Sequence, residues 1–480
     1  MKFSLSWLRE HLETPATLEE ICATLNTIGL EVEGVEDRGA ILAPFRTARI
    51  IEATQHPNAD RLRVCQVHAG EGFERVQVVC GAPNARTGLH VIFAPPGTFI
   101  PASGITIKAG KLRGEESGGM LCSLRELGLG AESDGIAELP DGTVPGQSYA
   151  LFADLDDPVI DIAITPNRGD ALAVRGVARD LAAAGLGELR PWMTETVEGH
   201  FETPINWRIT YPEACPWVLG RSIRNVRNGP SPEWLQRRLE SIGLRPVSAL
   251  VDITNFFAFD LGRPLHVFDA DKLMGTEFTI CRGAGENFVA LDGSEHVMTP
   301  DDCVIADGRG VQSLAGIMGG AETGVSETTT NVFVECALFD PVAIALSGRR
   351  HNLHSDARQR FERGVDQALP PAALEAATRM ILELCGGEAG SVVSAGQEPA
   401  WQRQAHLEFA RLETLGGLAV ASDQAVHLLE RLGFGVRERD SRHVVVDVPS
   451  WRNDIATPLL LDQGANLPAA RAQAAAQGAA

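Results

Sequence analysis

Five basic side chains fall in two short segments where they could contact the phosphates of a nucleic acid. Arg61 and Arg63 follow the turn-forming run HPNAD. Lys108, Lys111 and Arg113 lie farther along the chain, around a glycine. Guanidinium and ammonium groups bind phosphate oxygens, and a strip of them can follow a nucleic-acid backbone. The alternative is that HPNAD is only the turn before a strand and that these cations form a solvated face. The residues alone leave both interpretations open.

The thiols show no spacing that suggests a metal site or a disulfide framework. They are odd in number and scattered, and they never form a Cys-x-x-Cys pair. Zinc sites and disulfide frameworks use paired or regularly spaced cysteines, so the pattern argues against both. The nine cysteines are Cys22, Cys65, Cys80, Cys122, Cys215, Cys281, Cys303, Cys336 and Cys385.

The overall composition is globular and acidic. The chain has 480 residues, 44% of them hydrophobic and 22% charged, which predicts two to four domains. The formal net charge of −21 disfavours non-specific adhesion to nucleic acid, so any such contact must use a local basic surface. The first residues carry charges before any long apolar run, and no run approaches the ~20 apolar residues that span a bilayer. We therefore expect a reduced, cytoplasmic protein with no membrane partner.

Two changes of pattern divide the first part of the chain. Residues 5–28 have helical spacing, with Thr17 and Glu20 as a capping box and Gly29 as a stop, which predicts a small helical unit. From about residue 40 to 150, short β-branched runs alternate with glycine, proline and asparagine turns. That pattern is typical of a small antiparallel barrel. Residues 158–187 are then predicted to return to helix.

A second mixed region follows. A helix is predicted with Ser231 as its N-cap and Pro232 at its first position, and another over the periodic run that begins at Pro370. Residues 405–456 suggest a further small unit of helices and a strand. Strand-like runs are expected at 277–282, 303–307 and 331–335. The alanine-rich stretch 458–480 has no amphipathic face and is predicted to be disordered.

Three segments, taken in chain order, resemble a tRNA-binding domain with an oligonucleotide/oligosaccharide-binding (OB) fold. They are HPNADRLRVCQV (56–67), VVCGAPN (78–84) and KLRGEESGGMLCSLRELGL (111–129). The flanking motifs MKFSLSWLRE, IGLEVEGVE and ITPNRGDAL, with the later GRPLHVFD, LAGIMGG and RRHNLHSDARQRFERGVD, are similar to the β subunits of bacterial phenylalanyl-tRNA synthetases. The resemblance runs from Met1 to about Ile455.

The resemblance implies an α+β multidomain protein. An OB-fold barrel is inserted after an N-terminal helical unit, and a mixed α/β editing domain and a small C-terminal α/β unit follow. The implied parts are a helical unit of residues 1–38 plus 151–200, the OB-fold domain 39–150, a B3/B4-type editing domain 201–395, an incomplete B5-type domain 396–457 and an aberrant tail 458–480.

The family implies an assembly of two α and two β subunits, in which α carries the ATP-dependent synthetic site for charging tRNA(Phe). Nothing in this chain offers an ATP-cradling glycine loop with its lysine. In the β subunit, the resemblance implies tRNA contacts and an editing pocket that hydrolyses mischarged Tyr-tRNA(Phe). The implied tRNA-binding residues are Arg61, Arg63, Lys111 and Arg113.

Editing is needed because an apolar phenylalanine pocket rejects an isostere with one extra hydroxyl by only ~10²-fold. A second pocket with a polar partner for the phenol selects in the opposite direction. Phenylalanine leaves that buried acceptor unpaired, at a cost of ~1–3 kcal/mol.

The implied editing residues form three groups. Glu335 accepts a hydrogen bond from the phenol, and Ala315 and Gly316 let the backbone approach the substrate. His266, Thr254 and Asn255 are the implied catalytic residues at the ester end, with no single general base assigned. The alternative is structural for each: a hydrogen-bonded core histidine, a capping glutamate and a tight glycine turn.

A cluster of arginines permits two interpretations. They are interspersed with Asp356, Glu362 and Asp366. One interpretation is contact with RNA or the α subunit, and the other is an interdomain network of ion pairs. The arginines are Arg349, Arg350, Arg358, Arg360 and Arg363.

The end of the resemblance departs from the family. Asp454 matches one magnesium ligand of the family, but Leu460, Gln463 and Gly464 stand where three further carboxylates are expected. A lone carboxylate holds Mg²⁺ weakly, so the site is predicted to be incomplete. The chain therefore looks truncated or frame-shifted after about residue 456. The alternative function is a non-catalytic tRNA-binding or assembly module that has lost pairing with α through that truncation.

Overall fold

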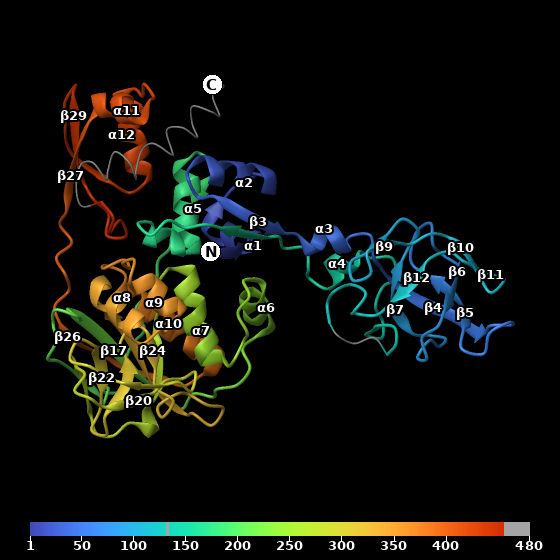
Figure 1. The fold of residues 1–480 in the computed structure, drawn as a ribbon, viewed down its shortest axis with the longest axis horizontal. Helices are drawn as coiled ribbons and strands as arrows, with labels where there is room; N and C mark the ends of the chain where they lie inside the picture. Colours follow the sequence, from blue (N-terminus) through green and yellow to red (C-terminus); the bar gives the residue numbers. More distant parts are fainter. Residues whose placement is uncertain (131–133, 456–480) are drawn as a thin grey trace. The chain divides into compact units, whose positions relative to one another are not determined.

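The computed structural model describes residues 1–130 and 134–455, and the chain divides into two units (Figure 1). One unit comprises Met1–Gly34 and the chain from Ile160 onward, and the other comprises Val35–Val159. The second unit is therefore an insertion in the first. The stretch 458–480, predicted to be disordered, lies outside the described residues. Among those described, no helix combines the length and the apolarity that crossing a membrane requires.

The N-terminal part contains two helices within residues 5–28, over which the sequence showed helical spacing. α1 ends at His11 and α2 begins at Leu18, because Pro15 between them has no N–H to continue a helix. The capping box is confirmed: the Thr17 N–H donates to Glu20 Oε2 at 2.8 Å, and the Glu20 N–H donates to Thr17 Oγ1 at 3.3 Å. The elements are β1 (Lys2–Ser4), α1 (Leu5–His11), β2 (Leu12–Glu13), α2 (Leu18–Thr27) and β3 (Val32–Glu36).

The segment after the insertion begins as a strand, so the helix predicted from residue 158 is wrong over its first part. The run VIDI is the central strand of a three-stranded sheet of order β1-β14-β3, with three of its four residues buried, and α5 follows it. The elements are β14 (Val159–Ile162), η1 (Gly169–Leu172), α5 (Val174–Ala183) and β15 (Glu188–Leu189).

The inserted unit is built on antiparallel strands, as predicted for residues 40–150. Its main sheet has the order β12-β7-β4-β5-β6, with β13 also paired to β7. All five residues of β7 are buried, which places this strand in the core. The elements are α3 (Arg38–Leu42), β4 (Arg46–Gln55), β5 (Arg63–His68), β6 (Val76–Cys80), β7 (His90–Ala94), β8 (Phe99–Ile100), β9 (Ile105–Thr106), β10 (Gly110–Leu112), β11 (Glu115–Ser117), β12 (Met120–Cys122), β13 (Glu138–Leu139) and α4 (Tyr149–Phe152).

The central part, from β16 to β26, contains two larger sheets. One has the order β16-β19-β22-β23-β24 and the other β18-β25-β17-β26. The three predicted strand runs are confirmed as β19, β22 and β25. The strands are β16 (Asn206–Ile209), β17 (Trp217–Arg224), β18 (His266–Asp269), β19 (Glu277–Arg282), β20 (Asn287–Val289), β21 (Glu295–Val297), β22 (Cys303–Ala306), β23 (Val311–Leu314), β24 (Met318–Gly319), β25 (Asn331–Leu338) and β26 (Glu388–Gly396).

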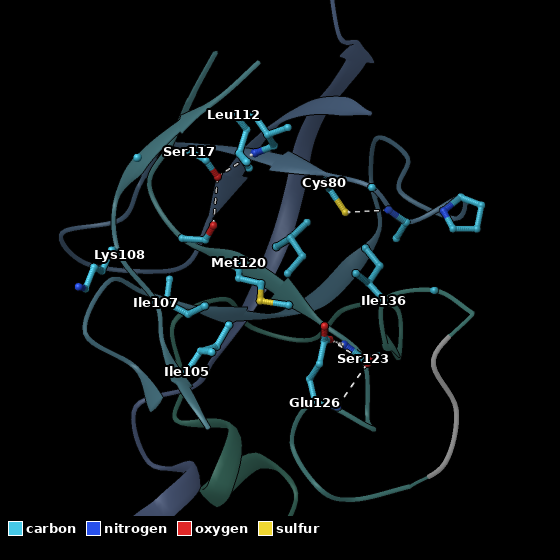
Figure 2. Close-up of a pocket in the computed structure, with 18 of the residues that line it drawn as sticks. Cys80, Ile105, Ile107, Lys108, Leu112, Ser117, Met120, Ser123, Glu126 and Ile136 are labelled. Carbon is cyan, nitrogen blue, oxygen red and sulfur yellow. Dashed lines mark hydrogen bonds between the residues drawn. The ribbon is translucent and has the colours of Figure 1, made fainter. Parts of the chain in front are cut away.

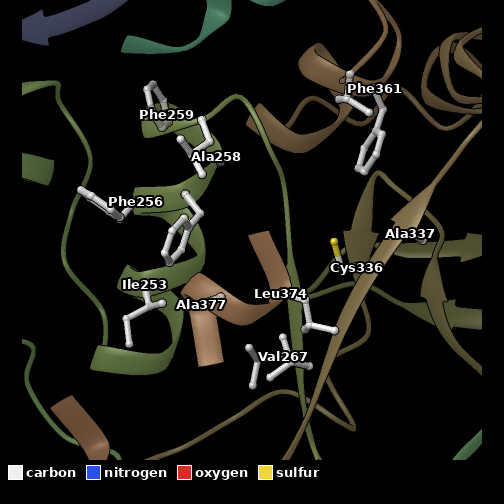
Figure 3. Packing of buried hydrophobic residues seen from close by; sticks show 14 of the residues in the cluster. Ile253, Phe256, Ala258, Phe259, Val267, Cys336, Ala337, Phe361, Leu374 and Ala377 are labelled. Carbon is white, nitrogen blue, oxygen red and sulfur yellow. The ribbon is translucent and has the colours of Figure 1, made fainter. Parts of the chain in front are cut away.

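Helices cover one side of these sheets (Figure 1). α10 packs against α7, β17 and β25, and Figure 3 shows part of the apolar core that these elements share. The helix predicted from Pro370 is confirmed as α10. The helices are α6 (Glu233–Ser241), α7 (Ala249–Asp260), η2 (Ala270–Lys272), α8 (Pro341–Arg350), α9 (Asp356–Phe361) and α10 (Pro370–Cys385).

The predicted cap of α6 is wrong. Pro232 is the N-cap residue, in an extended conformation, and the helix begins at Glu233. The Ser231 hydroxyl instead donates to Asp252 at 2.6 Å. Asp252 is fully buried and accepts from the Ser231 hydroxyl and from the Val247 N–H, and losing a donor to a buried carboxylate costs more than an uncapped helix end.

A three-stranded sheet of order β27-β29-β28 forms the last described part. This part of the chain contains the strand and the helices predicted for residues 405–456. The elements are β27 (Gln404–Glu408), α11 (Phe409–Gly416), α12 (Ser422–Arg431), β28 (Gly435–Arg439) and β29 (His443–Asp447).

Candidate functional site

A cavity of about 440 Å³ lies in the central part, lined by residues of α7, β18, β24, β25 and α9. The lining includes most of the residues that the sequence assigned to an editing pocket. They are Thr254, Asn255, His266, Gly316 and Glu335. Ala315 is buried beside Gly316 and is not part of the lining. Residues far apart in the sequence therefore share one cavity.

His266 and Glu335 are cross-strand partners. β18 and β25 pair in the antiparallel sense, with His266 directly opposite Glu335. Directly opposed residues of an antiparallel pair project from the same face of the sheet, with Cβ atoms roughly 5 Å apart. The imidazole and the carboxyl group are therefore held side by side by backbone pairing rather than by a mobile loop.

Glu335 is 6% exposed. Burial raises its pKa from 4.5 to about 7, and the positive charge of Arg263 and a hydrogen bond with the Ala337 backbone oppose the rise. The side chain is consequently poised between its neutral and ionised forms near neutral pH. A carboxyl group in this state accepts a hydrogen bond most strongly once it has lost its proton.

The His266 imidazole is neutral at physiological pH. Burial lowers its pKa from 6.5 to about 4, and its Nε2 atom has no hydrogen-bond partner in the described part of the chain. The ring packs edge-on against Phe268, with the ring centroids 4.4 Å apart. The Nε2 atom is itself buried and lies beside Gly319, while the residue lines the cavity. A neutral imidazole with an unpaired nitrogen can accept a proton or bind a polar ligand.

Two glycines give the cavity its shape. A Cβ atom on Gly319 would lie 2.3 Å from Cε1 and 2.5 Å from Nε2 of His266, so any larger residue displaces the imidazole. Gly316 has a φ of 68°, and a Cβ there would lie 2.7 Å from Phe339. Only glycine fits both positions without a local rearrangement.

Thr254 and Asn255 lie on α7 and are half-buried at the cavity wall. The Thr254 hydroxyl donates to the carbonyl of Val251 at 2.7 Å, within its own helix. Its oxygen can still accept a hydrogen bond. The geometry thus places both side chains at the wall of the cavity that also contains His266.

The buried carboxyl group predicts a measurable effect on stability. In the folded protein Glu335 holds its proton up to about pH 7, whereas in the unfolded chain it loses it near pH 4.5. The free energy of unfolding therefore falls as the pH rises from about 4.5 to about 7. The destabilisation by the buried charge is complete near pH 8. We expect Glu335→Gln to raise the free energy of unfolding near pH 8 by roughly 3 kcal/mol relative to wild type, and much less near pH 5. The melting temperatures of both proteins across this range test it.

The matched control is Glu295→Gln on β21, where the carboxylate is exposed. That change should leave the melting temperature equal to wild type at every pH. His266 titrates in both proteins and cancels in the comparison. A Glu335→Gln difference that does not depend on pH would contradict the buried ionisation.

The basic residues of the inserted unit are brought together by two hydrogen bonds. Asn58 Nδ2 donates to the Arg113 carbonyl at 3.2 Å, and His56 Nε2 lies 3.1 Å from the Leu112 carbonyl oxygen. The HPNAD turn thus lies against the β10–β11 hairpin. Arg61, Lys111 and Arg113 are exposed and Arg63 is half-buried. Lys111 also approaches Glu116 at 3.7 Å, which partly neutralises its charge.

A second cavity, of about 630 Å³, lies in this inserted unit. Figure 2 shows Ile107, Met120 and Ile136 around it, with Lys108 at its edge. Its lining combines apolar side chains with Lys108 and Lys111. Apolar side chains suit the faces of nucleotide bases, and lysines suit the phosphates. The structure assigns no reaction to this cavity.

The arginines between 349 and 363 mainly form internal pairs. Arg358 and Arg360 are buried. Arg358 Nε lies 3.0 Å from Glu362 Oε2, and Arg360 Nη1 lies 3.2 Å from Asp356 Oδ1. The geometry therefore favours ion pairing for these two arginines, but both pairs lie within α9 and its C-cap, so they do not form the interdomain network that was predicted.

Asp454 is held as an ion pair. The Arg452 guanidinium donates to both of its carboxylate oxygens, at 2.8 and 2.9 Å, and Asn167 approaches at 3.3 Å. Within residues 1–130 and 134–455, no three histidine, cysteine or carboxylate side chains cluster so as to hold a metal ion. Positions 460, 463 and 464 lie outside the described residues. The residues described do not fit a Mg²⁺ site, and Asp454 as a ligand stays a prediction.

The sequence did not point to all of the residues that shape the cavity. Gly319 was one glycine among several in LAGIMGG, and only the approach of the imidazole distinguishes it. The apolar wall contains Val251, Leu265 and Phe361, whose side chains look like ordinary core residues in the sequence.

Comparison with known proteins assigns three domain families to the chain. The B3/4 domain family matches residues 214–386, a putative tRNA-binding domain matches 45–148 and the tRNA synthetase B5 domain matches 405–459. The phenylalanine–tRNA ligase β subunit of Gluconobacter oxydans is 62% identical over 467 residues, which is 97% of this chain. The chain belongs to the phenylalanine–tRNA ligase β-subunit family.

Other family members give the same result. The β subunit of Mesorhizobium japonicum is 51% identical over 456 residues, or 95% of this chain, and that of Rhodospirillum rubrum is 53% identical over 462. The chain spans 57% of the length of the G. oxydans protein and 56% of the M. japonicum one. The cavity with His266 and Glu335 lies inside the B3/4 match.

Proposed function

We propose that this chain carries the editing function of a phenylalanine–tRNA ligase β subunit and hydrolyses mischarged Tyr-tRNA(Phe). The single observation that carries the proposal is the placement of Glu335 and His266 side by side at one cavity. One group can recognise a phenol and the other can activate water. Ala315 and Gly316 are proposed to bring the backbone close to the amino acid.

Recognition in this proposal depends on the buried carboxylate. The tyrosine hydroxyl donates to Glu335, which replaces the water that the carboxylate loses on binding. Phenylalanine fills the same space and leaves the carboxylate without a donor. A site built to pair with a hydroxyl rejects the analogue that lacks it more strongly than an apolar pocket rejects the added hydroxyl.

Hydrolysis in this proposal depends on the neutral imidazole. His266 Nε2 accepts a proton from a water molecule that attacks the ester carbonyl, and then returns it to the ribose oxygen as the ester bond breaks. Its pKa of about 4 keeps the imidazole unprotonated at physiological pH, at the expense of its strength as a base. Thr254 and Asn255 orient the ester from α7.

The rest of the chain is proposed to hold the substrate and the synthetic subunit. The inserted unit is proposed to be an OB-fold domain of residues 39–150 that contacts tRNA(Phe) through Arg61, Arg63, Lys111 and Arg113. The remaining proposed domains are 1–38 plus 151–200, 201–395 and 396–457. ATP-dependent charging would take place in the α subunit, in a cytoplasmic complex of two α and two β subunits, with Mg²⁺ and ATP used there.

The decisive experiment measures deacylation by the purified 480-residue chain. We expect Tyr-tRNA(Phe) to be hydrolysed well above the buffer rate, and Phe-tRNA(Phe) to be hydrolysed at least 10²-fold more slowly, since the unpaired carboxylate penalises phenylalanine. Adding the α subunit tests assembly and charging in the same preparation. If neither ester is cleaved faster than in buffer, the editing proposal fails and a non-catalytic binding module is left.

A further inference from the structure

Arg263 is hydrogen-bonded to the strand that carries the proposed phenol-binding group, and it was not among the candidate residues. It sits between α7 and β18 and is 0% exposed. Its Nη2 atom donates to the carbonyl of Ala337, on the same strand as Glu335 and two residues beyond it. Its Nε and Nη1 atoms have no hydrogen-bond partner in the described part of the chain. The guanidinium packs 5.5 Å from the ring centre of Phe361, which lines the cavity.

A buried guanidinium with two free donors needs a compensating negative charge, because isolated charges are strongly disfavoured in the protein interior. Glu335 supplies the negative charge that interacts with Arg263. No direct ion pair within 4 Å is present between them, so the attraction acts through space rather than through a fixed hydrogen bond. The carboxyl group consequently remains free to face a ligand.

The other ionisable groups around Glu335 carry no charge near neutral pH. His266, opposite it on β18, is neutral because burial lowers its pKa to about 4. Three buried thiols also interact with Glu335, from the segment before β17, from β22 and from β25 itself, and burial raises the pKa of each. They are Cys215, Cys303 and Cys336. Arg263 is therefore the charged side chain that acts on this carboxyl group.

We propose that Arg263 is a positioning residue that sets the substrate selectivity of the cavity: its charge keeps the buried Glu335 able to act as an ionised acceptor for a phenol. The inference rests on the proposed editing function and names a residue on which that function depends. Arg263 touches neither the substrate nor the water. It acts through Glu335 alone.

Loss of the guanidinium charge changes the chemistry of the cavity in a defined direction. Without it, Glu335 holds its proton to higher pH, since a neighbouring opposite charge typically lowers a carboxyl pKa by about 1–3 units. A protonated carboxyl group is a weaker hydrogen-bond acceptor than a carboxylate. The tyrosyl ester therefore loses more stabilisation in the cavity than the phenylalanyl ester. Selectivity then appears only in more alkaline solution.

The test compares Arg263→Met with Arg263→Lys in the full chain. The rates of Tyr-tRNA(Phe) and Phe-tRNA(Phe) hydrolysis are measured from about pH 6 to about pH 9, and their ratio is plotted against pH. For Arg263→Met we expect the midpoint of the ratio to move up by about 1–3 pH units and the ratio at pH 7 to fall by about tenfold or more. Arg263→Lys keeps the charge and should keep the midpoint near that of wild type.

Arg360→Met is the matched control for the loss of a buried arginine. Arg360 is 1% exposed, lies in the same part of the fold and donates to a backbone carbonyl, that of Ala258, at 2.6 Å. It pairs with Asp356 rather than with Glu335. Its replacement should lower the melting temperature and leave the midpoint of the ratio unchanged.

The possible outcomes separate this inference from the proposed function. If wild type hydrolyses Tyr-tRNA(Phe) selectively and folded Arg263→Met keeps the wild-type midpoint, the role of Arg263 is refuted and the editing function stands. If Glu335→Ala leaves wild-type selectivity intact, the proposed function is itself refuted. If Arg263→Met does not fold, Arg263→Gln replaces it in the test. If the midpoint of Arg263→Gln equals that of Arg263→Lys, the charge at position 263 has no effect and the inference is refuted.

Discussion

Glu335→Ala is expected to reduce the selectivity of the chain for Tyr-tRNA(Phe) over Phe-tRNA(Phe) by about 10²-fold, close to the loss of all discrimination. A hydrogen bond to a charged group contributes about 1.5–3 kcal/mol, which corresponds to a factor of about 10–150 in rate. Alanine removes the acceptor and leaves space that either aromatic ring can fill. The loss should come from slower hydrolysis of the tyrosyl ester and from faster hydrolysis of the phenylalanyl ester.

Single-turnover deacylation of both esters measures this change. Glu335→Gln serves as an intermediate, because an amide oxygen can accept from the phenol without the charge that strengthens the bond. Glu295→Ala, on an exposed strand, is the matched control and should behave as wild type. Equal selectivity in Glu335→Ala and wild type would mean that the buried carboxyl group does not recognise the hydroxyl.

The selectivity of the wild-type protein should also depend on pH, because Glu335 loses its proton near pH 7. Below that point the carboxyl group is neutral, and above it the ionised acceptor is present. The same ionisation lowers the stability of the folded protein. The recognition group is therefore one whose burial is unfavourable for folding, which is common where function requires a desolvated charge.

Part of this site could be predicted from the sequence alone. The run 331–335 was expected to be a strand, which places Glu335 in a sheet, whereas no strand was expected at His266. The pairing register of the two residues was not expected, because the distance between them along the chain exceeds sixty residues and short-range patterns carry no register. The resemblance to a family, rather than periodicity, brought His266 and Glu335 into one hypothesis.

Other features required three-dimensional contacts. Arg263 reads in the sequence as one more surface cation, since arginine is rarely fully buried, and its contact with Ala337 comes from a strand that follows much later. Ser231 had the type and spacing of a helix cap, but the buried Asp252 competes for its hydroxyl. Local rules fail at such positions because a tertiary partner offers a stronger interaction.

His266→Ala is expected to lower the rate of Tyr-tRNA(Phe) hydrolysis by about 10²–10⁴-fold, the usual contribution of a positioned general base. Selectivity should change much less, because Glu335 remains. In a Glu335→Gln background, where no carboxyl group titrates near pH 7, the rate should not fall with acid until about pH 4, where the imidazole gains a proton. In that background a rate that falls below about pH 6.5 would instead indicate an exposed imidazole with its ordinary pKa.

Gly319→Ala tests the same imidazole without removing it. The added Cβ would lie 2.3 Å from Cε1 and 2.5 Å from Nε2 of His266, so the ring and its unpaired Nε2 must shift from their position at the cavity wall. We expect most of the rate lost in His266→Ala to be lost here too, with selectivity retained. Gly229→Ala is the control, because no atom lies within 4 Å of a Cβ at that position. If Gly319→Ala kept the wild-type rate, the imidazole would be acting from another place or not at all, because a general base transfers protons only within hydrogen-bonding reach of the attacking water.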